Sequence, residues 1–539
     1  MRSGTQRIFM LCALTVVALA APAAATNLQD VALLVGANTF YDLGYDGNGV
    51  ILGNVEGGHV WNGHEVLDDG QITRREQFAG LELLESSHAT QVGGTMVAGP
   101  KLNNGTDTST GPGIAYGAEL WSGQIATSIS GNSFSISGNS LLWPLMMFGD
   151  VGFDGQKVNV INSSWGATDD TGNTIINVIY DYLALQGVSM VVSAGNAGQG
   201  AGTVAAPGNS WNVITVGATT SDLDIEQVTN FSSGGPTGSF NLDGTRTKPD
   251  IVAPGQSILM PTKSSSTSFA SSSGTSFSAP IVAAGAGLLI DYGQDTARST
   301  DPRVVKAVLM NSATKLEGWS QQTAIDSSTG AVINYTPVDG AQGAGRMNLT
   351  EAHRQYSASA GTGSGDGAVG LTGWDLNTVS EGDPRDYFID ATLLGGTELT
   401  ATLSWFMERG VNGFDPNAAD PFSGTSFHNQ SFDDLDLLLF AADADGLATG
   451  DALAASISNW DPNDPNANVV GLDSVEHLHY TLPADGQYVL RVLWSSELFD
   501  FITDPQQETY ALAWTAVPEP ATMAIFLVGA AVLLRRRTR

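Results

Sequence analysis

Cysteine is almost absent from this chain, because its 539 residues include one, Cys12. A single thiol cannot close an internal disulfide, so a small disulfide-stapled scaffold is excluded. Stability must then come from the hydrophobic core, with structural Ca²⁺ as a possible further contribution. No cofactor or metal is expected to be required for the chemistry of the chain, and no metal ligand is assigned.

Positive charge is also scarce. The sequence has 22 Lys and Arg against 55 Asp and Glu, which gives a formal net charge of −33 and a pI near 4.2. Nucleic-acid binding is disfavoured, because contacts to phosphates need a basic face. A strongly acidic surface favours solubility and association with cations, and it specifies no partner.

The N-terminal 25 residues have the layout of a secretory signal peptide. Arg2 and Arg7 precede an apolar run over residues 8–21, and Ala23-Ala24-Ala25 offers a small-residue cleavage site. Processing by a signal peptidase would remove Cys12 with this segment. We therefore expect an exported protein without cysteine.

The C-terminal segment over residues 517–539 combines Val517-Pro518-Glu519-Pro520, an apolar run over 521–534 and Arg535-Arg536-Arg537. It resembles a PEP-CTERM sorting tail, which implies a membrane-held precursor processed by an exosortase-type enzyme. A helix over the apolar run would be about 21 Å long, shorter than the roughly 30 Å hydrocarbon core. The resemblance implies a destination in the cell envelope, on the cell surface or in the extracellular matrix; a plain membrane anchor is the alternative.

The segment Gly274-Thr275-Ser276-Phe277-Ser278-Ala279-Pro280 places a serine just before a long apolar stretch. A helix that begins here is expected to be buried and to hold the Ser276 hydroxyl still near its N-terminal N–H groups. The segment resembles the nucleophile motif of the subtilisin-like serine peptidases (subtilases), which implies that Ser276 is the nucleophile. A helix start with a capping serine is the structural alternative. A lipase or esterase is disfavoured, because Gly-x-Ser-x-Gly is absent at Ser276.

One of the seven histidines, His88, lies in a block that resembles the His-Gly-Thr-x-Val-Ala-Gly motif of subtilases, with Ala89 in place of the glycine. Subtilases carry their triad in the order acid, histidine, serine. The resemblance therefore implies that His88 is the catalytic base. A loop histidine of the family corresponds to His64, for which a structural role is expected.

The acid departs from the family pattern. Residues 49–58 resemble the first core strand of subtilases, which ends in aspartate, but this chain has Glu56 there. The carboxylate of a glutamate lies about 1.5 Å further from the backbone, and Gly57 and Gly58 leave room for adjustment. Either Glu56 orients His88, which we favour, or the triad is weakened. The rival carboxylates Asp46, Asp68 and Asp69 fall in loop-like contexts.

The resemblance to subtilases also implies which residues form the oxyanion hole and the substrate cleft. Asn196 follows Ala-Gly after a buried strand, as the oxyanion asparagine of subtilases does, and the Ser276 N–H would be the second donor. The extended substrate would pair with backbone on both sides of the cleft. These positions are Ser164, Trp165 and Gly166 on one side and Ser193, Ala194 and Gly195 on the other. Trp165 is equally consistent with core packing.

Strands that alternate with helical stretches predict an α/β fold, and the resemblance over roughly residues 40–350 implies a subtilisin-like, mainly parallel sheet flanked by helices. We expect a peptidase domain over 26–356, a Gly/Ser-rich linker over 357–370 and a smaller all-β sandwich over 371–516. Two acidic segments in the sandwich, at residues 433–436 and 461–464, could bind Ca²⁺, but neither has a complete EF-hand pattern, so solvated turns are expected.

The sequence thus predicts an exported serine endopeptidase that acts on protein or peptide substrates through Glu56, His88, Ser276 and Asn196. The alternative is a catalytically weak or inactive peptidase fold that serves as a surface or matrix binding module. It is motivated by the Asp-to-Glu change and by the short stretch before residue 44, which leaves no room for a large propeptide.

Overall fold

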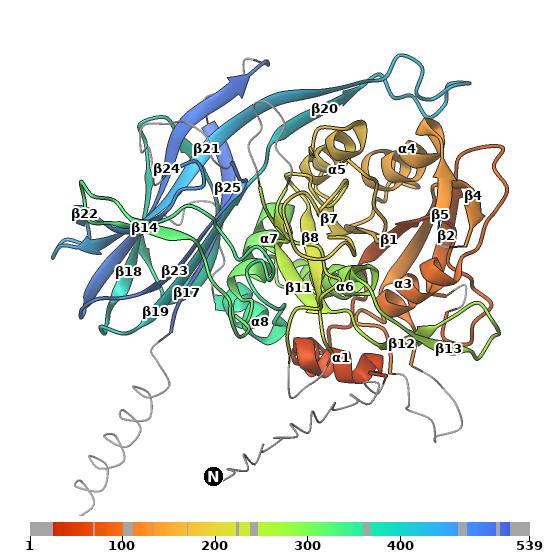
Figure 1. Cartoon of the computed structure of the whole chain (residues 1–539), viewed down its shortest axis with the longest axis horizontal. Helices are drawn as coiled ribbons and strands as arrows, with labels where there is room; N and C mark the ends of the chain where they lie inside the picture. The colour runs from red at the N-terminus through yellow and green to blue at the C-terminus, as the bar shows by residue number, and fades with distance from the viewer. Residues whose placement is uncertain are drawn as a thin grey trace, which may run out of the picture.

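The computed structural model describes residues 25–67, 70–100, 111–131, 133–169, 171–221, 226–237, 246–358, 367–461, 472–502 and 507–517. Almost all of the expected signal peptide and sorting tail, most of the linker, and Asp68 and Asp69 lie outside these residues. Figure 1 shows an α/β part beside a β-rich part.

A parallel sheet forms the centre of the α/β part and confirms the expected fold class. Seven strands hydrogen-bond in the order β11 (Ile251–Pro254), β8 (Ile214–Thr219), β7 (Ser189–Ser193), β6 (Val160–Ser163), β1 (Ile51–Glu56), β3 (Glu119–Gln124) and β2 (Ile72–Gln77). Each neighbouring pair is parallel. The carboxyl ends of β1, β6 and β7 therefore meet at one edge, where ligands bind in open sheets of this kind.

Helices cover both faces of this sheet. One core cluster joins Leu52 of β1 to α3 (Ser87–Val97) and α6 (Thr275–Asp295), and another joins Ile51 and Val55 to α4 (Gly138–Met146) and α5 (Ile175–Leu185). Side chains alternate along a strand, so Glu56 shares the face of Leu52. The strand thus directs its terminal carboxylate toward the helices that carry His88 and Ser276 in their first turns.

Helix α6 is apolar on all sides. By length and composition it is the one helix among the described residues that qualifies as a candidate membrane span, but 83% of its most apolar window is buried inside the protein. A helix surrounded by protein in this way belongs to the core. Ser276, in its first turn, is therefore held in a rigid setting.

Smaller elements complete the α/β part. The helices are α1 (Leu28–Val35), α2 (Asn38–Tyr41), the π-helical turn η1 (Met147–Val151), α7 (Pro302–Asn311) and α8 (Leu349–Ala358). Three antiparallel pairs are β4 (Ala126–Ser130) with β5 (Ser133–Ile136), β9 (Gly235–Pro236) with β10 (Thr247–Lys248), and β12 (Ile258–Pro261) with β13 (Phe269–Ser272).

The second part consists of two further sheets, as expected of a sandwich. The larger runs β14 (Thr323–Ile325), β15 (Val332–Asn334), β22 (Ala448–Ser456), β21 (Ser426–Ala442), β24 (Gly486–Asp500), β18 (Arg385–Leu393), β16 (Gly367–Val369), with β20 (Glu408–Asn412) added to β21. The smaller runs β17 (Thr372–Ser380), β25 (Gln507–Val517), β19 (Glu398–Trp405), β23 (Val475–Thr481). Strands β14 and β15 come from the range assigned to the peptidase domain, yet β15 pairs with β22.

The two parts share their cores. Trp211 of the α/β part belongs to the core cluster of the sandwich, while Phe406, just after β19, belongs to the cluster that covers α4 and α5. The ribbon of β20 and β21 leaves the sandwich and runs across α5 toward α4 at the top of Figure 1. The sandwich is therefore packed onto the α/β part over a broad surface.

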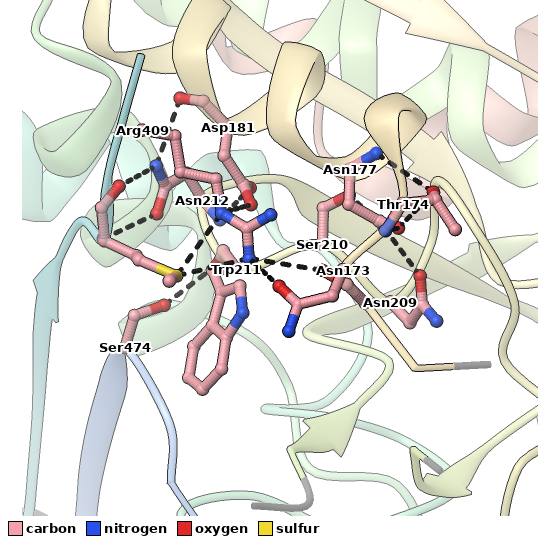
Figure 2. Close-up of polar contacts among 12 residues, drawn as sticks. Asn173, Thr174, Asn177, Asp181, Asn209, Ser210, Trp211, Asn212, Arg409 and Ser474 are labelled. Carbon is pink, nitrogen blue, oxygen red and sulfur yellow. Dashed lines mark hydrogen bonds and ion pairs between the residues drawn. The ribbon is translucent and has the colours of Figure 1, made fainter. Parts of the chain in front are cut away.

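A buried ion pair fastens the β20–β21 ribbon. Arg409 of β20 lies 3.2 Å from Asp181 of α5, and both side chains are fully buried. Figure 2 shows Arg409 reaching Asn173 as well, with a hydrogen bond of 2.9 Å. Beside it, the amide of Asn212 bonds the Met407 backbone twice, at 2.8 and 2.9 Å.

The acidic segment at residues 433–436 is a strand and not a solvated turn. It lies inside β21, where Asp434 is 1% exposed and Asp436 is 6% exposed. The expectation was wrong because local composition does not show that residues 433–436 pair with β24, which lies far away in the sequence.

Candidate active site

Glu56 and His88 form an ion-pair geometry at the carboxyl end of the central sheet. The Glu56 Oε2 atom lies 3.1 Å from His88 Nδ1, and its Oε1 atom accepts the Ser164 N–H at 2.8 Å. The carboxylate is almost completely buried, whereas 41% of the His88 side chain is exposed. Glu56 is therefore held from two sides and can orient the imidazole through Nδ1, leaving Nε2 for substrate chemistry.

Local structure fixes His88 on α3. Ser86 caps the helix by accepting the Ala89 N–H at 3.1 Å. The strand holds the same helix, because Asn54 of β1 donates to the Ala89 carbonyl at 3.2 Å. The small residues after His88 allow close packing: a Cβ at Gly93 would lie 2.8 Å from a Val60 methyl.

Charge and burial act on His88 in opposite directions. Desolvation lowers its pKa, but the charge of Glu56 and the hydrogen bond to it outweigh that effect and raise the pKa above 6.5. A base with a raised pKa must lose its proton before it can accept another. The neutral form that a general base requires is thus reached at higher pH than for an ordinary histidine.

Ser276 is the second residue of α6 and lies near His88. The His88 ring is 5.6 Å from the ring of Phe277, the residue after Ser276. The Ser276 hydroxyl donates to the Ser164 carbonyl at 3.1 Å. Within the described ranges, no hydrogen bond joins it to His88.

Ser164 therefore has two backbone roles that the sequence did not predict. Its N–H holds Glu56 and its carbonyl holds Ser276. It follows β6 directly, which pairs with β1, so the sheet itself sets the spacing between acid and serine. A backbone role has no signature in residue type, and the sequence offered no signal for it.

Asn196 lies beside the start of α6. Its Oδ1 accepts the Thr275 N–H at 2.9 Å, and Thr275 Oγ1 accepts the Gly195 N–H at 3.1 Å. Because Oδ1 is occupied by the backbone, the amide nitrogen of this exposed side chain is the group that remains to donate. Thr275 is thus a positioning residue, and the Gly-Thr-Ser motif was the signal for it.

The predicted cleft residues differ in exposure. Gly166 is exposed, Gly195 is half-buried, and Ser164, Ser193 and Ala194 are buried. Trp165 is 7% exposed, and its indole N–H donates to the Val55 carbonyl at 3.1 Å. Its ring packs on Tyr180 of α5 and Phe134 of β5, so it contributes to the core on the α4 and α5 face.

Gly57 and Gly58 allow neighbouring segments to pack closely, rather than allowing the backbone to adjust around Glu56. A Cβ at Gly57 would lie 2.9 Å from Phe134, and one at Gly58 would lie 2.7 Å from the Leu84 carbonyl oxygen. The β4–β5 hairpin therefore approaches the end of β1 directly. The extra methylene of Glu56 is accommodated by its contacts to His88 and Ser164.

The other histidines and acids near the sheet have structural partners. His64 Nε2 bonds the Ser268 carbonyl at 3.0 Å, in line with the expected structural role. His59 bonds Gln77 at 2.7 Å, and desolvation lowers its pKa to about 4. Asp46 accepts the Asn48 N–H at 3.1 Å and lies in a loop. No group of three or more His, Cys, Asp or Glu side chains in the described ranges is placed to hold a metal ion.

Residues 76–332 match the family model described as Subtilase family. This range contains His88, Asn196 and Ser276 but begins after Glu56, so the assignment of the acid depends on geometry and on local resemblance.

Curated relatives agree with this match. An extracellular protease of Xanthomonas campestris pv. campestris is 31% identical over 262 residues, 47% of this chain and 41% of the relative. The serine protease AprX of Bacillus subtilis is 34% identical over 170 residues, 29% of this chain and 36% of the relative. This chain thus spans less than half the length of either relative.

Among solved structures, the prenylagaramide maturation protease PagA superposes with a TM-score of 0.43 at 20% identity, over 59% of this chain and 97% of that one. The family match and the two curated relatives thus show that the central region of this chain is similar to serine peptidases of the subtilase family.

Proposed function

We propose that the chain is an exported serine endopeptidase that hydrolyses peptide bonds of protein or peptide substrates. The observation that carries the proposal is the contact between Glu56 and His88 at 3.1 Å beside a serine at the start of α6. In this scheme Ser276 attacks the carbonyl, His88 takes and returns the proton, and Glu56 stabilises the imidazolium. The chemistry needs no cofactor.

The same groups serve the later steps. The Asn196 amide and the Ser276 N–H would donate to the oxyanion, where one lost donor costs about 10²–10³ in kcat. The backbone at Ser164 and Gly166 would pair with the extended substrate, facing the backbone of residues 193–195. Because the Ser164 carbonyl now accepts the Ser276 hydroxyl, a substrate N–H that took this acceptor would release the hydroxyl toward His88.

The nucleophile is tested by Ser276→Ala. We expect loss of fluorophosphonate labelling and a drop in casein hydrolysis of about 10⁶ in kcat, the size found when the nucleophile of a subtilisin is removed. The control Ser278→Ala changes the buried serine two residues later, which is not placed in the reaction, and should remain reactive to the probe. Casein hydrolysis by Ser276→Ala at the unmutated rate would refute the assignment.

A second function is favoured by one observation. The Ser276 hydroxyl bonds a carbonyl and not the imidazole, which is the arrangement expected of an inactive fold used as a binding module. Catalytic hydrogen bonds are often long before substrate binds, so we prefer the enzyme. Failure of correctly folded protein to react with the fluorophosphonate would favour the binding module.

We further propose export through the N-terminal segment and sorting to the cell envelope, surface or matrix through the Pro-Glu-Pro tail. Support comes from the sequence layout and from the extracellular relative. Expression with and without residues 517–539 tests the tail, because removal should release the protein from the membrane fraction. An unchanged distribution would contradict the sorting role.

A further inference from the structure

The helix that carries His88 is joined to the segment leading into Ser276 by a side chain that the proposed mechanism does not use. Gln91 of α3 donates from its Nε2 to the Ser272 hydroxyl at 2.9 Å. Ser272 is the last residue of β13, and α6 begins three residues later, at Thr275. The hydrogen bond therefore links the helix of the base to the strand that precedes the nucleophile.

Gln91 lies on the same side of α3 as His88. Residues three apart in a helix are neighbours on its surface. Both side chains approach the nucleophile segment, since the His88 ring lies 5.6 Å from the ring of Phe277 and Gln91 reaches Ser272. Gln91 is 7% exposed, and burying an amide without a hydrogen-bond partner is costly. The fold therefore favours the separation of α3 and β13 at which this hydrogen bond forms.

The end of β13 is itself fixed relative to α6. Ser272 pairs with Ile258 of β12. Two residues later, the Gly274 N–H donates to the Gly255 carbonyl at 2.8 Å. Ser272 cannot move away from the start of α6 without disturbing these backbone contacts, so a contact to Ser272 also places α3 relative to Ser276.

Apolar packing between α3 and the β12–β13 hairpin does not specify this placement. A Cβ at Gly94 of α3 would collide with the Pro261 ring at the end of β12, so the helix lies directly on the strand. Such contacts are non-directional and allow a helix to slide along its neighbour. A hydrogen bond has a preferred length and angle, so Gln91 is the contact that sets the position along the hairpin.

The position of α3 matters because serine and imidazole are not yet paired in this structure. The Ser276 hydroxyl donates to the Ser164 carbonyl at 3.1 Å. Before its proton can pass to His88, the hydroxyl must turn, and the imidazole must then lie within hydrogen-bond reach. A misplacement of about 1 Å can lower the rate by about 10². The reaction therefore depends on how firmly α3 is held against the nucleophile segment.

We propose that Gln91 is a positioning residue for the peptidase reaction, and that through Ser272 it sets the distance between His88 and Ser276. The inference rests on the proposed function and deepens it. Gln91 occupies the position that the subtilase motif His-Gly-Thr-x-Val-Ala-Gly leaves open, so the motif itself assigns it no role.

The test compares Gln91→Leu, Ser272→Ala and the double variant in the full chain. For each protein we measure kcat and KM with a peptide substrate and the rate constant of fluorophosphonate labelling, per labelled site. Each single variant should lower kcat and the labelling rate constant about 10-fold, while KM changes less than about twofold. The double variant should lose no more than the weaker single variant, because all three lack the same hydrogen bond.

Three further measurements separate positioning from a general loss of structure. The acidic limb of the kcat/KM profile should not move, because the Glu56 contact to His88 remains. Ser272→Thr keeps the hydroxyl and should retain activity. Ser271→Ala removes the exposed hydroxyl of the preceding residue and should leave both rates unchanged.

Unchanged rates in Gln91→Leu and Ser272→Ala would overturn the inference. So would losses that multiply in the double variant, because the two residues would then act independently. Ser272 is half-buried, so Ser272→Ala keeps the test decisive if Gln91→Leu folds poorly. Failure of the correctly folded, unmutated protein to react with the fluorophosphonate would instead overturn the proposed function, and this inference with it.

Discussion

Buried carboxylates of the α/β part and of the sandwich include two opposite arrangements. In the α/β part, Asp250 lies 2.7 Å from Lys248 Nζ and 3.4 Å from Lys306 Nζ. Burial by itself would raise the pKa of Asp250, but the two lysines and the Thr215 N–H hold it below its ordinary value. Glu56 likewise has His88 and a backbone N–H as partners.

In the sandwich, the buried acids Asp434 and Glu476 have neutral partners. Asp434 accepts from Asn459, and Glu476 accepts from the Ser456 hydroxyl at 2.6 Å. Burial, reinforced by Asp433, raises the pKa of Asp434 to about 7. Burial also raises the pKa of Asp436 and of Glu476 well above their ordinary values. The folded protein therefore favours the protonated, uncharged form of these acids.

The two arrangements predict opposite responses to pH. For Asp434 the folded pKa exceeds the ordinary 3.8, so its contribution to stability is complete below about pH 4 and is lost as the pH rises to about 7. For Asp250 the folded pKa is lower, so its contribution is present above the ordinary value and is lost as the pH falls through the folded one. Asp250, which is paired with lysines, thus stabilises the folded protein at neutral pH. Asp434, which has an uncharged partner, stabilises it at mildly acidic pH.

The largest expected effect is a loss of catalysis when the paired acid Glu56 is replaced. Glu56→Gln keeps an acceptor for the Ser164 N–H but removes the charge on which His88 depends, so kcat should fall by about 10⁴, as loss of a triad acid does. Without that charge, desolvation dominates and the pKa of His88 drops, which moves the acidic limb of the kcat/KM profile to lower pH. Stopped assays across pH 5–10 measure both effects.

Glu56→Asp is the matched variant, because it keeps the charge but withdraws the carboxylate by about 1.5 Å. It should preserve the direction of the His88 pKa shift while losing one of the two contacts of Glu56. If kcat and the acidic limb were unchanged in Glu56→Gln, another group would have to be the acid.

The next effect concerns an acid whose cation comes from the other part of the molecule. Arg409→Ala leaves Asp181 buried without its partner, so the free energy of unfolding should fall by about 3–5 kcal/mol. Chemical denaturation followed by tryptophan fluorescence measures this change. Adding Asp181→Asn to Arg409→Met should recover much of the loss, because no unpaired charge remains.

A loss below about 1 kcal/mol in Arg409→Ala would mean that the ribbon does not depend on this ion pair. It would also weaken the view that the sandwich is fastened to α5 by charge rather than by apolar packing alone.

The smallest expected effect is on the slope of the unfolding free energy against pH. Asp434→Asn removes one titrating group, so the fall of unfolding free energy between pH 4 and 7 should flatten by up to about 1.4 kcal/mol per pH unit. Asp451→Asn on β22 makes the same substitution at an exposed position and should leave the slope unchanged. Equal slopes in all three proteins would show that Asp434 is ionised in the folded state.

Much of the site could be predicted because it is encoded locally. The strand ending in Glu56, the helix carrying His88 and the apolar helix after Ser276 each have a readable pattern, and the structure places them around one edge of the sheet. The position of the β20–β21 ribbon could not be predicted, since no sequence pattern near Arg409 indicates that Asp181 is its partner. Strands β14 and β15 are three residues each and are strands because β14 pairs with β15 and β15 pairs with the distant β22.

The sequence by itself determined the order of acid, histidine and serine, the α/β pattern with a β-rich second part, and the excess of acidic charge. Each of these depends on residue type and short-range spacing. Tertiary structure alone decided that the Ser276 hydroxyl bonds the Ser164 carbonyl, that Trp165 lies in the core, and that Asp434 and Asp436 are buried. Hydrogen-bond partners and desolvation depend on what distant segments bring to each side chain, and a linear sequence does not contain those distances.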